Sequence, residues 1–171
     1  MQARLLGRER RRLHEKALAA IQEAGDRDWA AVAWHAQGAG RYDELVEAAR
    51  KGAKSYLHQG STAEALRLAE TGLSEADHDP DLLAAASKAA WMIGLPPLAI
   101  EHGRRWHAQA AAGGDPAAEA AALVHLARLY WEARDFPHQW QTVWAALRWP
   151  SRSGSPSPWP APTAWPPRPT C

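Results

Sequence analysis

The chain has very little of what a disulfide-bonded, metal-binding or membrane-spanning protein needs. Its only cysteine is the last residue, Cys171, so we expect neither a disulfide framework nor a thiolate metal cluster. No stretch approaches the roughly 18 consecutive apolar residues of a membrane span. Residues 1–12 are charged and lack the apolar segment of a signal peptide. These absences predict a cytoplasmic protein that makes no contact with a membrane.

Motifs that hold phosphates or activate nucleophiles are also missing. There is no Gly-x-x-x-x-Gly-Lys-Ser/Thr loop and no Gly-x-Gly-x-x-Gly, and Gly38-Ala-Gly40 is interpreted as a helix stop. His102 and His107 are spaced so that they fall on different sides of a helix, and we interpret the eight histidines as surface or packing residues. No serine–histidine–acid set is suggested. We therefore expect a protein that is not an enzyme and that has no cofactor and no metal site.

The remaining composition favours helices. Alanine, leucine, arginine and glutamate dominate up to about Leu147, and β-branched residues are scarce. The 20 Lys+Arg and 19 Asp+Glu residues nearly cancel, so no overall field selects nucleic acid or an anionic membrane. The sequence predicts one all-helical domain over residues 1–148.

Helix boundaries are marked by proline, aspartate and glycine. Asp79-Pro80 and Asp115-Pro116 each place an N-cap acid before a proline in the first helical position. Ser61-Thr-Ala-Glu64 has the form of a capping box. The first helix is expected to bury Leu13, Ala17, Ile21 and Ala24. We predict eight helices over residues 7–24, 29–37, 42–59, 62–76, 81–93, 97–112, 116–133 and 137–148.

A 34-residue period organises these helices into pairs. Gly60 and Gly94 lie 34 residues apart, and each is followed five residues later by an alanine. In a third, less regular unit Arg134 takes the place of the turn glycine. This period is typical of the tetratricopeptide (TPR) repeat, and it predicts a TPR-like α-solenoid of about eight short antiparallel helices. The stack should bury Tyr56, Leu66, Leu82, Ile93, Leu98, Leu123, Leu126 and Tyr130.

Three segments resemble the middle of the large ATP-binding LuxR-type regulators of the MalT-like group. They are the Arg-rich helix 11–21, the segment Ala33-Trp-His-Ala-Gln-Gly-Ala-Gly40, and the long helix that ends at Gly60 with Ala63-Glu-Ala-Leu66 after it. In that family a P-loop ATPase precedes the helical array and a helix-turn-helix follows it. The chain has neither, so the resemblance implies a truncated piece of a transcriptional regulator, its ligand- or partner-sensing arm.

The likeness to TPR proteins also implies a binding face, because the first helix of each TPR pair lines a concave groove. The ninth repeat position is a cation in all three units: Lys54, Lys88 and Arg128. The twelfth positions are Leu57, Trp91 and Trp131, and the thirteenth are His58, Met92 and Glu132. All of these except Glu132 are candidate binding residues, with the three cations. Such a row suits a protein or peptide partner with acidic and apolar residues, or a carboxylate terminus. In the alternative interpretation the cations are solvated and the tryptophans pack between neighbouring units.

A second function class rests on the basic cluster in the first helix. Phosphate contact through these side chains would make the chain a nucleic-acid-binding protein. In the alternative they form a solvated face, with Glu9 and Glu15 interleaved. We favour a protein partner over nucleic acid. The cluster comprises Arg8, Arg10, Arg11, Arg12 and Lys16.

The last predicted helix and the segment that follows it raise separate expectations. No helix follows to cover Trp140, Val143, Trp144 and Leu147, so this face should be exposed and prone to self-association. Residues 149–171 are rich in proline, serine and tryptophan, and we expect them to be disordered. We interpret this segment as the product of a frameshift in a GC-rich gene. The alternative is a genuine Pro-rich linker or an SH3-type ligand tail.

Overall fold

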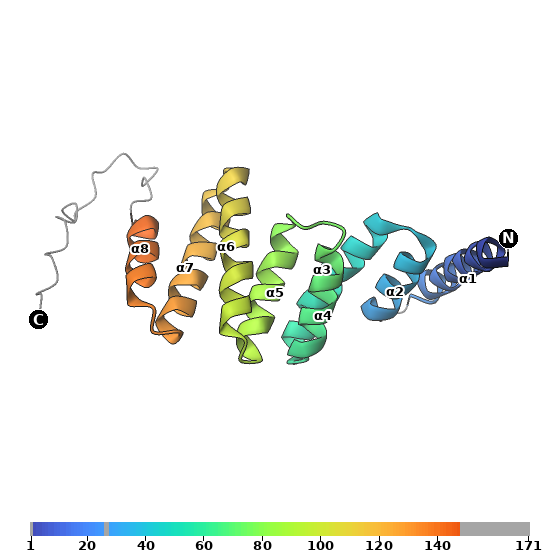
Figure 1. Ribbon diagram of the computed structural model, residues 1–171, viewed down its shortest axis with the longest axis horizontal. Helices are drawn as coiled ribbons and strands as arrows, with labels where there is room; N and C mark the ends of the chain where they lie inside the picture. The colour runs from blue at the N-terminus through green and yellow to red at the C-terminus, as the bar shows by residue number, and fades with distance from the viewer. Residues whose placement is uncertain (1, 26–27, 148–171) are drawn as a thin grey trace, which may run out of the picture.

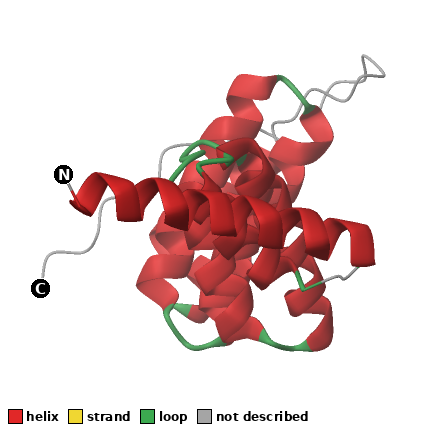
Figure 2. Ribbon diagram, turned by 90° about the vertical axis from the view of Figure 1, so that its right-hand side faces the viewer, coloured by secondary structure: helices red, strands yellow, loops and turns green. Residues whose placement is uncertain are grey.

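The computed structural model describes residues 2–25 and 28–147, and within these ranges the protein consists of eight α-helices and no strand (Figure 2). The predicted all-helical class is confirmed. The largest differences from the expected bounds are an earlier start of α1 and an earlier end of α4. The predictions for residues 148–171 lie outside the described residues. The helices are α1 (Gln2–Ala24), α2 (Trp29–Ala39), α3 (Tyr42–Gln59), α4 (Thr62–Leu73), α5 (Pro80–Met92), α6 (Pro96–Gly113), α7 (Pro116–Glu132) and α8 (Phe136–Leu147).

The helices follow one another in a row, from α1 at one end of the molecule to α8 at the other (Figure 1). Each helix packs mainly against its neighbours in the chain, and α3 also contacts α5. Such contacts between sequential elements need only short connections, because each helix returns beside the previous one. The contact between α3 and α5 is the one that matters for the candidate site.

Small residues form much of the core. Alanines and leucines dominate the buried positions, and they allow helix axes to approach closely. Gly72 shows how close the approach is, because a Cβ placed there would lie 2.6 Å from Leu82 Cδ1 and 2.7 Å from Ala49 Cβ. The glycine therefore packs α4 tightly between α3 and α5.

Two helix starts follow the prediction and one does not. Asp79 accepts a hydrogen bond from Leu82 N at 2.9 Å, and Asp115 accepts one from Ala117 N at 2.9 Å. The predicted capping box at Ser61 is wrong: its side chain makes no capping hydrogen bond. The Ser61 N–H that Glu64 was expected to bind is already donated to the Tyr56 carbonyl at 2.9 Å.

The three predicted turn positions share one backbone conformation. Gly60 and Gly94 have φ values of 78°, and Arg134 has a φ of 56°. In each case the next residue donates its N–H to the carbonyl five residues back, as in Leu95 N to Ala90 O at 2.9 Å. This is the hydrogen bond of a Schellman-type helix end. The equivalence of Arg134 with the turn glycines is therefore confirmed.

Most of the expected core is buried. Leu66, Leu82, Leu123, Leu126 and Tyr130 are buried, as predicted. Tyr56 and Leu98 are partly buried against the core. The prediction for Ile93 is wrong, because this residue lies in the turn beyond the last residue of α5 and is 37% exposed.

The first helix buries a different residue from those expected. Leu13 is 67% exposed, whereas Leu18 is fully buried. The prediction for Leu13 and Ala24 is wrong because α1 packs mainly on α2, so only a narrow stripe of the helix meets the core.

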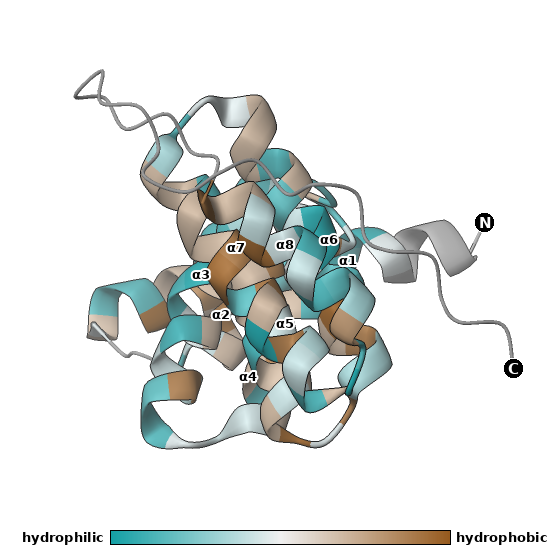
Figure 3. Cartoon of the chain, turned by 90° about the vertical axis from the view of Figure 1, so that its left-hand side faces the viewer, coloured by the Kyte–Doolittle hydropathy of each residue, from teal (hydrophilic) through white to brown (hydrophobic). Residues whose placement is uncertain are grey.

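Apolar and polar residues are interspersed along the helices, as the view from the α8 end shows (Figure 3). Among the described helices, none combines the length and the apolar character needed to cross a bilayer. The amphipathic pattern is that of helices which bury one stripe against their neighbours.

Candidate binding groove between α3 and α5

A hollow of about 670 Å³ lies between α3 and α5, and we call it the α3/α5 groove. Four of the eight predicted binding residues line it. These are Lys54, Leu57 and His58 from α3, and Lys88 from α5. The other lining residues are Glu47, Arg50, Lys51, Asp81, Ala84 and Ala85.

Helical periodicity explains how both helices turn a polar stripe to this groove. On α3 the buried residues are Leu45, Ala48, Ala49, Gly52 and Ala53. The groove residues of α3 lie on the adjacent stripe, at positions 47, 50, 51, 54, 57 and 58. On α5 they lie at 81, 84, 85 and 88, again at spacings of three and four. Each helix therefore packs with one face and offers the next face to the groove.

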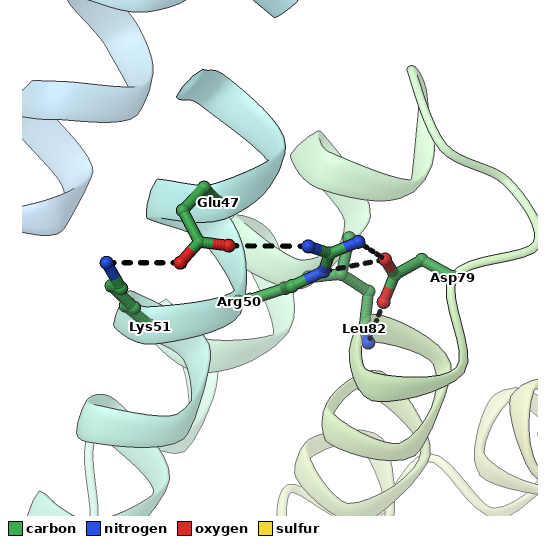
Figure 4. A network of polar contacts seen from close by, with 5 residues as sticks. All are labelled: Glu47, Arg50, Lys51, Asp79 and Leu82. Carbon is green, nitrogen blue, oxygen red and sulfur yellow. Dashed lines mark hydrogen bonds and ion pairs between the residues drawn. The ribbon is translucent and has the colours of Figure 1, made fainter. Parts of the chain in front are cut away.

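The groove is braced by a polar network around Arg50 (Figure 4). Arg50 donates to Asp79 Oδ2 from Nε at 2.7 Å and also from Nη2, and Asp79 Oδ1 caps α5 at Leu82 N. Glu47 accepts from Arg50 Nη1 at 3.3 Å and pairs with Lys51 Nζ at 3.1 Å. The hydrogen bonds to Asp79 raise the pKa of Arg50, and that from Lys51 lowers the pKa of Glu47. Two of the groove cations are thus already paired.

Lys54 and Lys88 are the cations left to face a ligand. Within the described part of the chain, Lys54 has neither an ion pair nor an aromatic contact. The Lys88 ammonium lies 5.3 Å from the centroid of the Trp106 ring, a cation–π contact that leaves its hydrogen-bond donors unused. Among the ion pairs of the described residues none involves Asp81, the second carboxylate of the lining. The groove therefore presents positive charge beside the apolar surface of Leu57 and the two alanines.

The other four predicted residues lie outside the groove lining. The Arg128 guanidinium stacks on Trp91, with its Cζ 4.2 Å from the ring centroid, and so ties α7 to α5. Met92, the last residue of α5, lies beyond the groove residues and is 52% exposed. The centroid of the Trp131 ring lies 5.8 Å from that of the Phe136 ring. The row Lys54, Lys88 and Arg128 does not share one hollow, because Arg128 is not part of the groove lining.

A serine–histidine pair that sequence reasoning missed joins α5, α6 and α7. Ser87 Oγ donates to the Ala99 carbonyl at 2.7 Å, so His125 Nε2–H, 2.9 Å away, must donate to Ser87. Burial, with Lys88 and Arg128 nearby, lowers the pKa of His125 to about 4. Because Ser87 is fully buried and its proton points to a carbonyl, the pair has a structural role: it connects α5, α6 and α7. No motif in the sequence marks two residues 38 positions apart.

Comparison with protein-family models gives no match, and comparison with curated proteins gives none either. The resemblance to MalT-like regulators therefore stays a prediction. Among the described residues no group of three or more histidine, cysteine, aspartate and glutamate side chains is placed to hold a metal ion. The α3/α5 groove is accordingly the site on which a functional argument rests.

Proposed function

We propose that the chain is a non-enzymatic, TPR-like helical-repeat module that binds an acidic peptide segment of a partner protein in the α3/α5 groove. The carrying observation is that Lys54 and Lys88 line one hollow together with Leu57. The repeat interpretation is supported by the shared turn geometry at Gly60, Gly94 and Arg134. We place the module in the cytoplasm, as its composition predicts.

The groove offers a peptide two kinds of contact. Carboxylates of the partner gain charge-assisted hydrogen bonds from the two lysine ammonium groups. Its apolar side chains cover Leu57, Ala84 and Ala85. Because both lysine side chains lie on the surface, their attraction for the peptide is screened by salt, and affinity should fall as ionic strength rises.

Fluorescence polarisation with a library of labelled peptides that carry Asp, Glu and Leu residues tests this function. Lys54→Glu and Lys88→Glu should each weaken capture by about tenfold, through loss of one attraction and gain of one repulsion. Arg67→Glu is the matched control, because Arg67 is an exposed α4 cation outside the groove. Equal binding by all three variants and the unaltered chain, or no binding to any acidic peptide, would refute the proposal.

We further propose that the module is the sensing arm of a MalT-like regulator, on the strength of the residues that carry the resemblance. Reading the coding DNA on both sides of the gene tests this origin. Frames for a P-loop ATPase upstream and a helix-turn-helix downstream are expected. Flanking DNA that encodes neither domain would count against this origin. It would not bear on the proposal that the α3/α5 groove binds a peptide.

The alternative function, nucleic-acid binding, is favoured by one observation. Arg8, Arg10, Arg11, Arg12 and Lys16 are all exposed along α1. If they contact phosphates, binding to duplex DNA must fall steeply with salt, by about one logarithmic unit in affinity per logarithmic unit of salt for each phosphate neutralised. A flat response in an electrophoretic shift assay would dismiss this alternative.

Finally, we propose that α8 promotes self-association of the chain. Among the described helices its main partner is α7. Of the four residues predicted to be exposed on this face, Trp140 and Leu147 are 53% and 54% exposed, whereas Val143 and Trp144 are half-buried. A second copy of the chain that covers this apolar surface would give α8 a packing partner besides α7.

A further inference from the structure

Two histidines from different helices meet at the interface of α1 and α2. His14 Nδ1 lies 3.2 Å from His35 Nδ1, and both rings are partly buried. The Trp34 ring packs edge-on against both imidazoles, at centroid distances of 4.7 and 4.6 Å. Gly38 makes room for this arrangement, because a Cβ there would overlap the His14 ring. The pair is therefore held in place by its surroundings.

The Nδ1 atoms have the separation that a metal ion requires. In the metal-free pair one Nδ1–H donates to the lone pair of the other, so only one ring carries its proton on this nitrogen. When that ring takes the Nε2–H tautomer, two lone pairs lie within 3.2 Å of each other. Two nitrogens bound to tetrahedral zinc at about 2.0–2.1 Å lie about 3.3 Å apart. A small displacement of either ring would bring both nitrogens onto one ion.

We propose that His14 and His35 form a two-imidazole site for a borderline transition-metal ion, which clamps α1 onto α2. The ring that carries its proton on Nδ1 takes the Nε2–H tautomer instead, so the ion is bound by two neutral imidazoles and no net proton is released. Water completes the coordination shell, since both side chains are partly exposed and no third protein ligand joins them among the described residues. Imidazole ligands suit Zn²⁺, Ni²⁺ and Cu²⁺, and the usual order of affinities places Cu²⁺ above the other two.

The surroundings hold both rings in place. Both imidazoles are partly buried, and the Trp34 ring packs edge-on against each of them. Because α1 packs mainly on α2, an ion that bridges the two helices stabilises the docked position of α1. Binding at this site is independent of the α3/α5 groove.

Isothermal titration of the untagged chain with Zn²⁺ and with Cu²⁺ tests the site. His14→Gln and His35→Gln should each weaken binding by at least about tenfold, because either change leaves a single imidazole. His138→Gln is the control, because it removes a more exposed histidine, which pairs with Asp135. It should bind like the unaltered chain. Equal affinities for all four proteins, or an equal loss in the control, would show adventitious surface binding and overturn the proposal.

A second measurement on the unaltered chain covers the case in which the variants fail to fold. Substoichiometric Cu²⁺ should broaden the imidazole nitrogen signals of His14 and His35 in an NMR spectrum before those of other histidines. Earlier broadening of exposed His58 or His78 would place the metal elsewhere and refute the site.

Discussion

Arg50 in α3 and Asp79 at the start of α5 are joined by two hydrogen bonds to a single carboxylate oxygen, Asp79 Oδ2. The other oxygen of the same carboxylate caps α5 at Leu82 N. Asp79 thus fixes both the start of α5 and its position beside α3. The Asp79 side chain is 4% exposed and the Arg50 side chain 42% exposed, so the pair is screened by water on one side only.

We expect Asp79→Ala to lower the free energy of unfolding by about 2 kcal/mol, of which about 1 is the lost N-cap and about 1 the lost partly exposed ion pair. Asp115→Ala is the matched control, since Asp115 also precedes a proline and caps its helix at Ala117 N. It should lose only the cap, about 1 kcal/mol. Urea denaturation measures both. Equal losses would mean that Arg50 contributes nothing to stability.

The buried His125 should make the fold sensitive to mild acid. Its pKa is about 4 in the folded chain, below the usual 6.5 of an unfolded histidine. Between these two values the unfolded chain binds more protons, so stability is lost as the pH falls from 6.5 towards 4. One such group contributes a slope of at most about 1.4 kcal/mol per pH unit. The lowered pKa values of His102 and His35 act in the same direction.

His125→Gln should flatten this pH dependence, because the amide still donates to Ser87 but cannot be protonated. Denaturation curves between pH 5 and 7 give the slope. His78→Gln, a change at an exposed histidine, should leave the slope as it is in the unaltered chain. If the two variants show the same slope, the assignment to His125 fails.

The turn glycines give a prediction about backbone conformation alone. Gly94 has a φ of 78°, and a Cβ placed there would touch nothing within 4 Å. Gly94→Ala should therefore lower stability by about 1 kcal/mol through strain in the left-handed region. Gly113→Ala is the control, because Gly113 is equally open but ends a helix without a positive φ. It should leave thermal stability unchanged or raise it.

Local signals in the sequence predicted the local structure well. Asp79-Pro80 and Asp115-Pro116 start helices, and Gly60 and Gly94 end them, because caps and left-handed turns depend on a few adjacent residues. The repeat pattern also predicted the turn at Arg134, which lies 134 − 94 = 40 residues after Gly94 and carries no glycine. The capping box at Ser61 failed, since the turn before it used the same backbone donor.

Most contacts between helices could not be predicted from the sequence pattern. Lys54 and Lys88, which are 88 − 54 = 34 residues apart, do line one groove. The pairing of Arg128 with Trp91, and of His14 with His35, depends on how neighbouring helices are rotated and offset. The ridge of side chains on one helix can pack against a neighbouring helix in several ways. The sequence pattern does not say which of these arrangements the folded chain adopts.

The last helix gives the prediction about association. The weight-average mass in sedimentation experiments should rise with protein concentration, because Trp140 and Leu147 leave apolar surface exposed on α8. Replacing both residues with glutamate should return the chain to a monomer, because a second copy would have to bury the new charges. The fold should survive, since exposed substitutions usually change stability by no more than about 0.5 kcal/mol.

Leu13→Glu is the control for this experiment, because Leu13 is 67% exposed on α1, at the other end of the row of helices. It should associate like the unaltered chain. Association that persists in the α8 double variant but disappears on Leu13→Glu would place the contact at α1. A chain that stays monomeric at every concentration would show that the α8 surface does not bind a second copy, whatever its apolar content.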